Sequence, residues 1–257
     1  MIDYDHSPVT VSGKRAVVVG GTSGIGQAIT MGFAEEGADV IATSRSEERV
    51  EETASELERR GAKTARVTCD VTDSESLERV RAVAVETFDG VDIVVASQGA
   101  ISRATVEGIS DEEWDHVTGV ALDGVRRVTQ TMVPAIDDGG SIINISSLAA
   151  RVSMANTPAY SAAKGGVEAF TRVSAKELAP EIRVNAIAPG YVITPQNRDT
   201  YAEGTDKRRR IDDRTPLGRV AARDEIVGAA VYLGSDAASY TTGDVLTIDG
   251  GFADSTF

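Results

Sequence analysis

Short apolar runs alternate along the chain with longer segments in which apolar residues recur every three or four positions. The runs have strand length and are mainly apolar, which is typical of strands buried on both faces of a parallel sheet. Seven runs predict strands at residues 15–19, 39–43, 64–69, 91–96, 142–146, 182–187 and 245–248. The pattern predicts an α/β protein with a doubly wound parallel sheet of about seven strands and helices on both faces.

Polar residues mark where several of the helices begin. Thr72–Glu75 and Ser110–Glu113 have the spacing of capping boxes, and Thr157 stands as an N-cap before the first-turn residue Pro158. The helix that opens at Ser110 is expected to run to about Ile136. The other predicted helices follow the first two strands and end near residues 36 and 60.

Neither a linker nor a repeat divides the chain, so we expect one domain over residues 1–257. Residues 1–13 are expected to form a short arm before the fold. Residues 195–216 are polar and long for a plain connection, which predicts a segment that covers the substrate. Within it, the basic run Lys207–Arg210 either attracts an anionic substrate group or forms a solvated helix face.

The charge balance changes this picture. Asp and Glu number 40 against 26 basic residues, of which 21 are Arg and 5 are Lys, and the net charge is −14. Acid excess with scarce lysine resembles proteins of a high-salt cytoplasm, so we expect a halophilic protein; the alternative is an ordinary acidic one. So negative a chain is a poor binder of nucleic acid or of an anionic membrane.

Several further classes are disfavoured by composition. No apolar run reaches the roughly 18 residues that a membrane span needs. The N-terminus is acidic and lacks a signal-peptide pattern, Cys69 is the single cysteine, and His6 and His116 are far apart in the sequence. We therefore expect a cytoplasmic enzyme for a small molecule, with no metal site.

A glycine-rich turn, Gly20–Gly26, joins the first predicted strand to a helix. Glycines at such a turn let the backbone approach a pyrophosphate, which then lies at the helix N-terminus. The second strand ends at Ser44 and Arg45, where a dinucleotide site reads the adenosine ribose. An acid there suits NAD, whereas Ser44 and Arg45 suit a 2′-phosphate, which favours NADP over NAD.

The stretch from Ser147 to Lys164 offers proton-transfer chemistry. Ser147 follows the end of a strand, and Tyr160 and Lys164 lie four residues apart on one helix, so they share a face. A nearby lysine cation lowers the pKa of a tyrosine, and a serine hydroxyl can bind a substrate oxygen. Together the three residues are candidates for acid–base chemistry at one C–O bond, although Tyr160 and Lys164 could also be a surface pair.

Motifs in order over nearly the whole chain resemble those of the short-chain dehydrogenase/reductase family, which has a Rossmann-like fold. Gly20, Gly24 and Gly26 match its cofactor turn, and Ser147, Tyr160 and Lys164 match its catalytic trio. Other matches are Asp70, Pro189-Gly190, Thr194, Thr242-Gly243 and Asp249-Gly250-Gly251. The segments 98–103 and 188–191 look most like those of sugar-acid dehydrogenases.

The resemblance implies a role for each matching residue. Tyr160 would be the general acid or base, Ser147 would orient the substrate oxygen, and Lys164 would bind the nicotinamide ribose. The implied cofactor-binding residues are Gly20, Thr22, Ser23, Gly24, Ile25, Gly26, Ser44, Arg45, Asp70, Val71, Ser97, Gly99, Tyr160, Lys164, Pro189, Gly190, Val192 and Thr194. The resemblance also implies a homotetramer or a dimer.

The chain departs from the family pattern at three places. The threonine usual before the first motif glycine is Val19, and the motif Asn-Asn-Ala-Gly is here Ala96-Ser97-Gln98-Gly99. The family's helix asparagine, which supports a water-linked proton path near the lysine, is Ala121. These departures leave three hypotheses open: an alcohol–ketone oxidoreductase acting on a sugar acid, a 3-oxoacyl-thioester reductase, and a dinucleotide-binding regulatory or scaffold protein without turnover.

Overall fold

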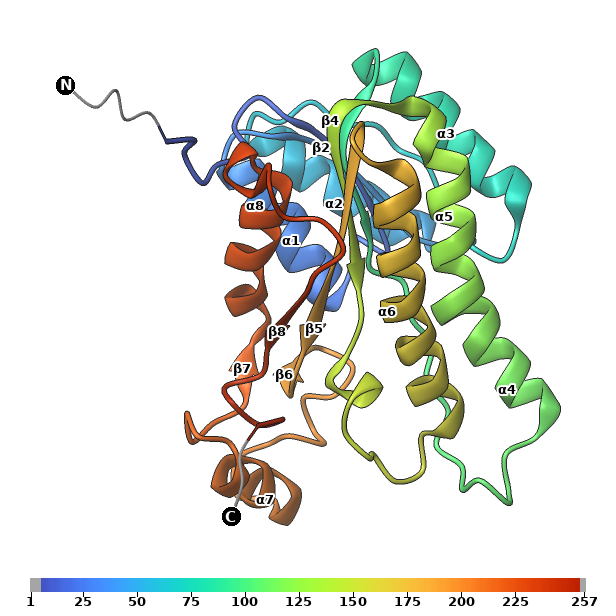
Figure 1. Ribbon diagram of the computed structural model, residues 1–257, viewed down its shortest axis with the longest axis vertical. Coiled ribbons are helices and arrows are strands. Elements are labelled where there is room, and N and C mark those ends of the chain that lie inside the picture. The colour runs from blue at the N-terminus through green and yellow to red at the C-terminus, as the bar shows by residue number, and fades with distance from the viewer. Residues whose placement is uncertain (1–5, 255–257) are drawn as a thin grey trace.

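A computed structural model describes residues 6–254 as one parallel sheet with helices on both sides (Figure 1). The elements in chain order are β1 (Arg15–Val19), α1 (Gly24–Glu35), β2 (Asp39–Thr43), α2 (Glu47–Arg59), α3 (Ser74–Phe88), β3 (Val91–Ala96), α4 (Asp111–Thr118), α5 (Gly124–Met132), β4 (Ile136–Ile145), α6 (Pro158–Leu178), β5 (Ile182–Pro189), β6 (Val192–Ile193), α7 (Asp206–Arg214), β7 (Ala221–Ala222), α8 (Val227–Gly234) and β8 (Val245–Ile248). The strand order β2-β1-β3-β4-β5-β8 confirms the doubly wound α/β architecture, with six strands in the main sheet.

Successive residues of the central strands pack on opposite faces of the sheet. Val18 of β1 packs with α1 and α8, whereas Val17 and Val19 pack with α3, α5 and α6. Figure 1 shows these two helical layers on either side of the strands. Because both faces are covered, most positions of the central strands are buried, and the half-buried or exposed ones lie at or near the strand starts. This burial explains why the runs are mainly apolar.

The predicted strand at residues 64–69 is wrong. This segment runs beside β2 at the sheet edge, but the backbone bonds between them are at its two ends, from Val40 N to Lys63 O and from Cys69 N to Ser44 O. Between them, the Arg66 guanidinium turns away and binds Glu51 and Glu58 of α2. The main sheet therefore has six strands rather than about seven.

The helix after this segment begins differently from the prediction. The Thr72 hydroxyl donates to the Asp70 carboxylate over 2.7 Å, so it does not cap the helix. Asp73 is the N-cap of α3, and its side chain accepts from the backbone N–H of Glu75. The predicted capping box at Thr72–Glu75 is therefore wrong, because the Thr72 hydroxyl binds the Asp70 carboxylate instead.

The helix that begins at Ser110 has its predicted capping box but is not regular along its length. A π-helical turn, Gly119–Asp123, separates α4 from α5. The chain has already entered β4 at Ile136, where the helix was expected to end, so β4 is longer than the predicted strand. Thr157 precedes α6 as expected, but its hydroxyl donates to Met154 O rather than capping the helix.

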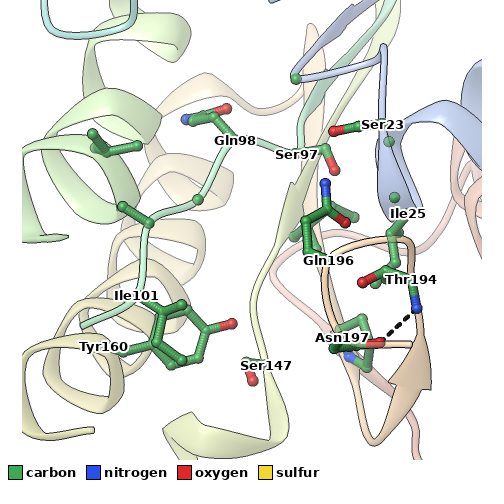
Figure 2. A pocket seen from close by; sticks show the side chains of 18 of the residues that line it. Ser23, Ile25, Ser97, Gln98, Ile101, Ser147, Tyr160, Thr194, Gln196 and Asn197 are labelled. Atoms are coloured by element: carbon green, nitrogen blue, oxygen red, sulfur yellow. Dashed lines mark hydrogen bonds between the residues drawn. The ribbon is translucent and has the colours of Figure 1, made fainter. Parts of the chain in front are cut away.

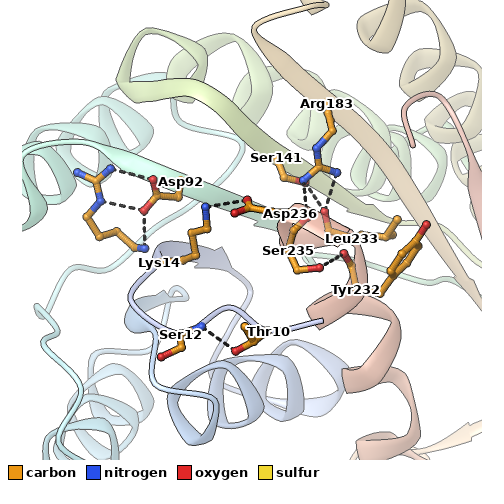
Figure 3. A network of polar contacts seen from close by, with 11 residues as sticks. Thr10, Ser12, Lys14, Asp92, Ser141, Arg183, Tyr232, Leu233, Ser235 and Asp236 are labelled. Atoms are coloured by element: carbon orange, nitrogen blue, oxygen red, sulfur yellow. Dashed lines mark hydrogen bonds and ion pairs between the residues drawn. The ribbon is translucent and has the colours of Figure 1, made fainter. Parts of the chain in front are cut away.

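Polar side chains tie the strands together at the edge where β1, β3 and β5 begin (Figure 3). Asp92 accepts from the backbone and the guanidinium of Arg15, joining β3 to β1. Arg183 of β5 and Ser141 of β4 both donate to the carbonyl of Leu233 at the end of α8. These bonds join the strands at one end of the sheet, and the cavity lies at the opposite end.

Residues 1–5 of the predicted N-terminal arm lie outside the described residues, and Val11 within the arm is fully buried. Among residues 6–254, no helix combines the length and the apolarity needed to cross a membrane.

Candidate active site

A cavity of about 760 Å³ lies at the carboxyl ends of the parallel strands. The chain passes from β1 to β2 on one side, whereas β3 pairs with β1 on the other, so the strand order reverses there. Ligands of open α/β sheets bind at such a reversal, because the loops leave the two strands in opposite directions. The cavity is therefore in the expected place for a dinucleotide.

The glycine turn forms one wall of the cavity by close backbone packing. A Cβ on Gly26 would lie 2.2 Å from Gly20 O, and a Cβ on Gly20 would lie 2.8 Å from Gln98 N. Gly20 also has a φ of +77°, a conformation that side chains disfavour. The Ser23 side chain makes no capping bond to α1, so the amides of the first turn can receive a pyrophosphate.

The residues at the end of β2 fit a 2′-phosphate. Ser44 and Arg45 line the cavity, and so does Arg49 in the first turns of α2, which the sequence analysis missed. No described residue forms an ion pair with the guanidinium of Arg45 or Arg49, whereas most surface arginines are paired. Thr22 does not line the cavity; its hydroxyl donates to Ser44 Oγ over 2.7 Å.

Asp70 lies on the cavity wall with its carboxylate ready to accept hydrogen bonds. Bonds from the Thr72 hydroxyl and backbone N–H hold the pKa of Asp70 below its usual value. The remaining predicted cofactor residues, apart from Thr22, also line this cavity, from Gly20 on the first turn to Thr194 beyond β6. The structure thus brings residues that are far apart in the sequence to one cavity, and their contacts with a cofactor stay a prediction.

Ser147, Tyr160 and Lys164 meet at the other end of the cavity. Figure 2 shows the Tyr160 hydroxyl turned toward Ser147. The Ser147 Oγ accepts from the backbone N–H of Ala149 over 3.1 Å, which fixes its rotamer. Lys164 is 3% exposed, and its Nζ donates to Ile145 O over 2.7 Å.

The direction of the Tyr160 pKa shift differs from the prediction. Burial raises the pKa of Tyr160, and the Ser147 hydroxyl offsets part of that rise. The Lys164 Nζ lies 5.8 Å from the tyrosine ring centroid and donates to Ile145 O, but burial sets the net direction of the Tyr160 shift. Burial also lowers the pKa of Lys164, to about 8. The phenol is therefore protonated at neutral pH and can act as an acid.

Residues 195–216 contribute side chains to the substrate end of the cavity. Tyr201 packs edge-on against Tyr191, with ring centroids 5.8 Å apart, and both line the cavity. Asn197 supports this wall by accepting from Thr194 N and donating to Val192 O. That the segment covers a substrate stays a prediction.

Two residues of the basic run contact Tyr201. Lys207 Nζ lies 5.1 Å from the Tyr201 ring centroid, and the Arg208 guanidinium donates to Tyr201 O over 3.2 Å while it also binds Asp212. Arg209 binds Asp206. Arg103, from the loop after β3, lines the same region. No local sequence pattern links Arg103, Tyr191 and Tyr201, so these three lining residues were not predicted. Within residues 6–254, no group of His, Cys, Asp and Glu could hold a metal ion.

The lowered pKa of Lys164 predicts a pH-dependent stability. Between about pH 8, the folded value, and pH 10.5, the ordinary value, the unfolded chain binds more protons than the folded chain. The Lys164 contribution to the free energy of unfolding therefore falls by about 3 kcal/mol as pH drops through this window. Lys164→Met removes this pH-dependent contribution. Urea unfolding of wild type and Lys164→Met between pH 8 and 10.5 will measure the change in their free-energy difference.

The exposed Lys176→Met variant is the matched control, and its stability difference from wild type should not change across the same pH range. A Lys164→Met difference that is equally flat would contradict the burial of the ammonium.

Comparison with known proteins agrees with this geometry. A family described as enoyl-(acyl carrier protein) reductase matches residues 19–253. A 3-oxoacyl-[acyl-carrier-protein] reductase of Thermotoga maritima is 37% identical over 94% of this chain and 98% of its own. A 2-dehydro-3-deoxy-D-gluconate 5-dehydrogenase of Bacillus subtilis is 36% identical over 97% of this chain and 98% of its own.

A solved structure described as an NAD(P)-dependent gluconate 5-dehydrogenase of Beutenbergia cavernae, with NADP bound at low occupancy, superposes with a TM-score of 0.89. It is 37% identical and covers 96% of this chain and 100% of its own. Since these matches span nearly the whole chain, and Ser147, Tyr160 and Lys164 line one cavity, the protein belongs to the short-chain dehydrogenase/reductase family of NAD(P)-dependent oxidoreductases acting on CH–OH groups.

Proposed function

We propose that this protein is an NADP-preferring oxidoreductase that interconverts a secondary alcohol and a ketone on a sugar acid. The observation that carries the proposal is the trio that lines the cavity, with the Tyr160 hydroxyl turned toward Ser147 and Lys164 buried. Two hydroxyls aimed at one point suit a single substrate oxygen. The relatives named for gluconate-type substrates support the sugar-acid part.

The residues divide the chemistry between them. A bound nicotinamide supplies or accepts the hydride at the substrate carbon. In ketone reduction, Tyr160 gives its proton to the carbonyl oxygen while the Ser147 hydroxyl donates a hydrogen bond to the same oxygen. The Lys164 ammonium adds positive charge beside the tyrosinate that remains. In alcohol oxidation the proton moves the opposite way, from the substrate hydroxyl to Tyr160.

The first test is turnover of wild type and Tyr160→Phe in molar KCl, with keto sugar acids, simple ketones and 3-oxoacyl thioesters. We expect NADPH-dependent reduction of a keto sugar acid, and loss of about 10³-fold in kcat for Tyr160→Phe. Binding of NADPH, followed by its fluorescence, should be preserved in the variant. Unchanged turnover in Tyr160→Phe would remove the tyrosine from the mechanism.

The thioester arm of this assay tests the second candidate. The Thermotoga maritima relative supports a 3-oxoacyl-thioester reductase. However, an acyl-carrier protein is itself acidic, and a partner with a net charge of −14 repels it over much of the surface. Turnover with thioesters alone would favour that reading over the sugar acid.

The preference for NADP rests on the end of β2. Arg45 and Arg49 line the cavity there together with Ser44, and no acid of the kind that binds a ribose 2′-hydroxyl follows the strand. The relative from Beutenbergia cavernae has NADP bound. A phosphate between these side chains gains charge-assisted hydrogen bonds that NAD cannot provide.

We expect Ser44→Asp with Arg45→Ile to lower the NADPH-to-NADH ratio of kcat/KM by at least about tenfold, since a charge-assisted bond contributes about 1.5–3 kcal/mol. The two kcat/KM values, measured with the same substrate, test this. Arg59→Ile, at the far end of α2, is the control and should leave the ratio unchanged. A double variant that keeps the wild-type ratio would exclude Arg45 as the selector.

The carboxylate of the substrate is assigned to Arg103 and Lys207. Burial, and next the positive charge of Arg103, lower the pKa of Lys207, so the two cations lie near each other. Neither forms an ion pair with a described residue, although the chain has an excess of acids. An anionic group between them would relieve their repulsion at the wall formed by Tyr201.

Arg103→Met and Lys207→Met should each raise KM for a keto sugar acid about tenfold, because each removes a charged partner of the carboxylate. KM for a neutral ketone should change less than about twofold. Arg210→Met, an exposed cation on the same helix, is the control. Equal effects on acidic and neutral substrates would show that the two cations do not bind the carboxylate.

A further inference from the structure

Glu168 is a buried carboxylate on α6 that the chemistry described so far does not use. It lies four residues after Lys164, about one helical turn along α6, and is 7% exposed. Its side chain does not line the cavity, so it contacts neither cofactor nor substrate there. A carboxylate is kept in such a place only with polar partners, and those partners indicate its role.

The first partner of Glu168 is the residue directly before Ser147. The buried Ser146 hydroxyl lies 3.3 Å from Glu168 Oε1 and 3.4 Å from Lys164 O, and it donates toward both. Ser146 follows Ile145, the last residue of β4. The end of β4 is thereby fastened to α6 immediately before Ser147.

The second partner comes from the other side of Ser147. Arg151 follows the 3₁₀ turn Leu148–Ala150, and its Nε donates to both carboxylate oxygens of Glu168 over 3.3 Å. The same guanidinium donates to Thr247 Oγ1 over 2.9 Å and so also binds β8. Arg151 therefore holds the end of the turn against α6 and β8 together.

This turn sets the direction of the Ser147 side chain. The backbone N–H of Ala149, in the middle of the turn, donates to Ser147 Oγ over 3.1 Å. A shift of the turn would therefore move the hydroxyl that faces Tyr160 (Figure 2). Because Glu168 is on the same helix as Tyr160 and Lys164, one carboxylate secures both flanks of Ser147 to that helix.

We propose that Glu168 is a positioning residue that holds the Ser147 hydroxyl opposite that of Tyr160. It acts through Ser146 and Arg151, and the inference rests on the proposed function of the same site. An ion pair with a buried member contributes little to stability, because desolvation of the charges offsets their attraction. The pair matters instead for geometry, since a displacement of about 1 Å between reacting groups can lower a rate about 100-fold.

Replacing both charges by apolar side chains tests the proposal. In Arg151→Met with Glu168→Leu no buried charge is left unpaired, so the melting temperature should stay within about 3 °C of wild type. We expect kcat for the substrate that wild type reduces to fall about tenfold, because the Ser147 turn loses its anchor. The Kd of NADPH should change less than about twofold, since no cavity-lining residue is replaced.

The matched control removes an ion pair of α3 that is remote from the cavity. Glu78→Leu with Arg81→Met should leave kcat unchanged. A lower melting temperature with unchanged kcat in the Arg151 and Glu168 double variant would mark that pair as structural and overturn the proposal.

Two single variants of Glu168 separate the hydrogen-bond acceptor from its charge. Glu168→Gln keeps a carbonyl oxygen that can accept from Ser146 and Arg151, so kcat should stay within about threefold of wild type. Glu168→Ala removes the acceptor and should lose about tenfold in kcat. A folded Glu168→Gln variant that loses as much activity as Glu168→Ala would overturn the role of the shared acceptor.

A measurement without substrate distinguishes this proposal from the proposed function. Crystal structures of wild type and of the Arg151 and Glu168 double variant compare the Ser147 side chain directly. In the variant we expect Ser147 Oγ to be displaced by about 1 Å or to occupy a second rotamer. An unchanged Ser147 side chain overturns the positioning role, whereas absence of wild-type turnover on every substrate overturns only the proposed function.

Discussion

The buried ammonium of Lys164 is the interaction on which the site depends. Its bond to the Ile145 carbonyl joins α6 to the end of β4, and thereby sets where Tyr160 lies, one turn earlier on the same helix. A cation that is 3% exposed is costly to keep charged, which its lowered pKa reflects. Because its pKa is lowered to about 8, the Lys164 ammonium can both stabilise negative charge and exchange protons.

The electrostatics of the cavity contrast with those of the whole chain. The protein carries a net charge of −14, yet four cations without ion pairs to described residues lie at or beside the cavity: Arg45, Arg49, Arg103 and Lys207. Positive charge concentrated in one cleft of an acidic protein focuses the field on anions that enter it. Both halves of the proposed chemistry use such anions, the phosphate of the cofactor at one end and the carboxylate of the substrate at the other.

Sequence patterns failed where an alternative partner was available to the residue concerned. The segment at residues 64–69 has strand-like composition, but Arg66 has two glutamates on α2 within reach and the backbone pairs with β2 only at the ends. Thr72 was predicted to close a capping box, but its hydroxyl donates to the Asp70 carboxylate instead. In both cases a side-chain contact replaced the local pattern, which propensity and spacing do not take into account.

The sequence by itself determined the features that depend on near neighbours. The glycine turn, the four-residue step from Tyr160 to Lys164 and the order of strands and helices follow from local spacing, because backbone geometry repeats over a few residues. Only the tertiary structure decided which distant side chains join the site, such as Arg103 and Tyr191. It also decided the direction of the Tyr160 pKa shift, since burial depends on how α6 packs against the rest of the cavity wall.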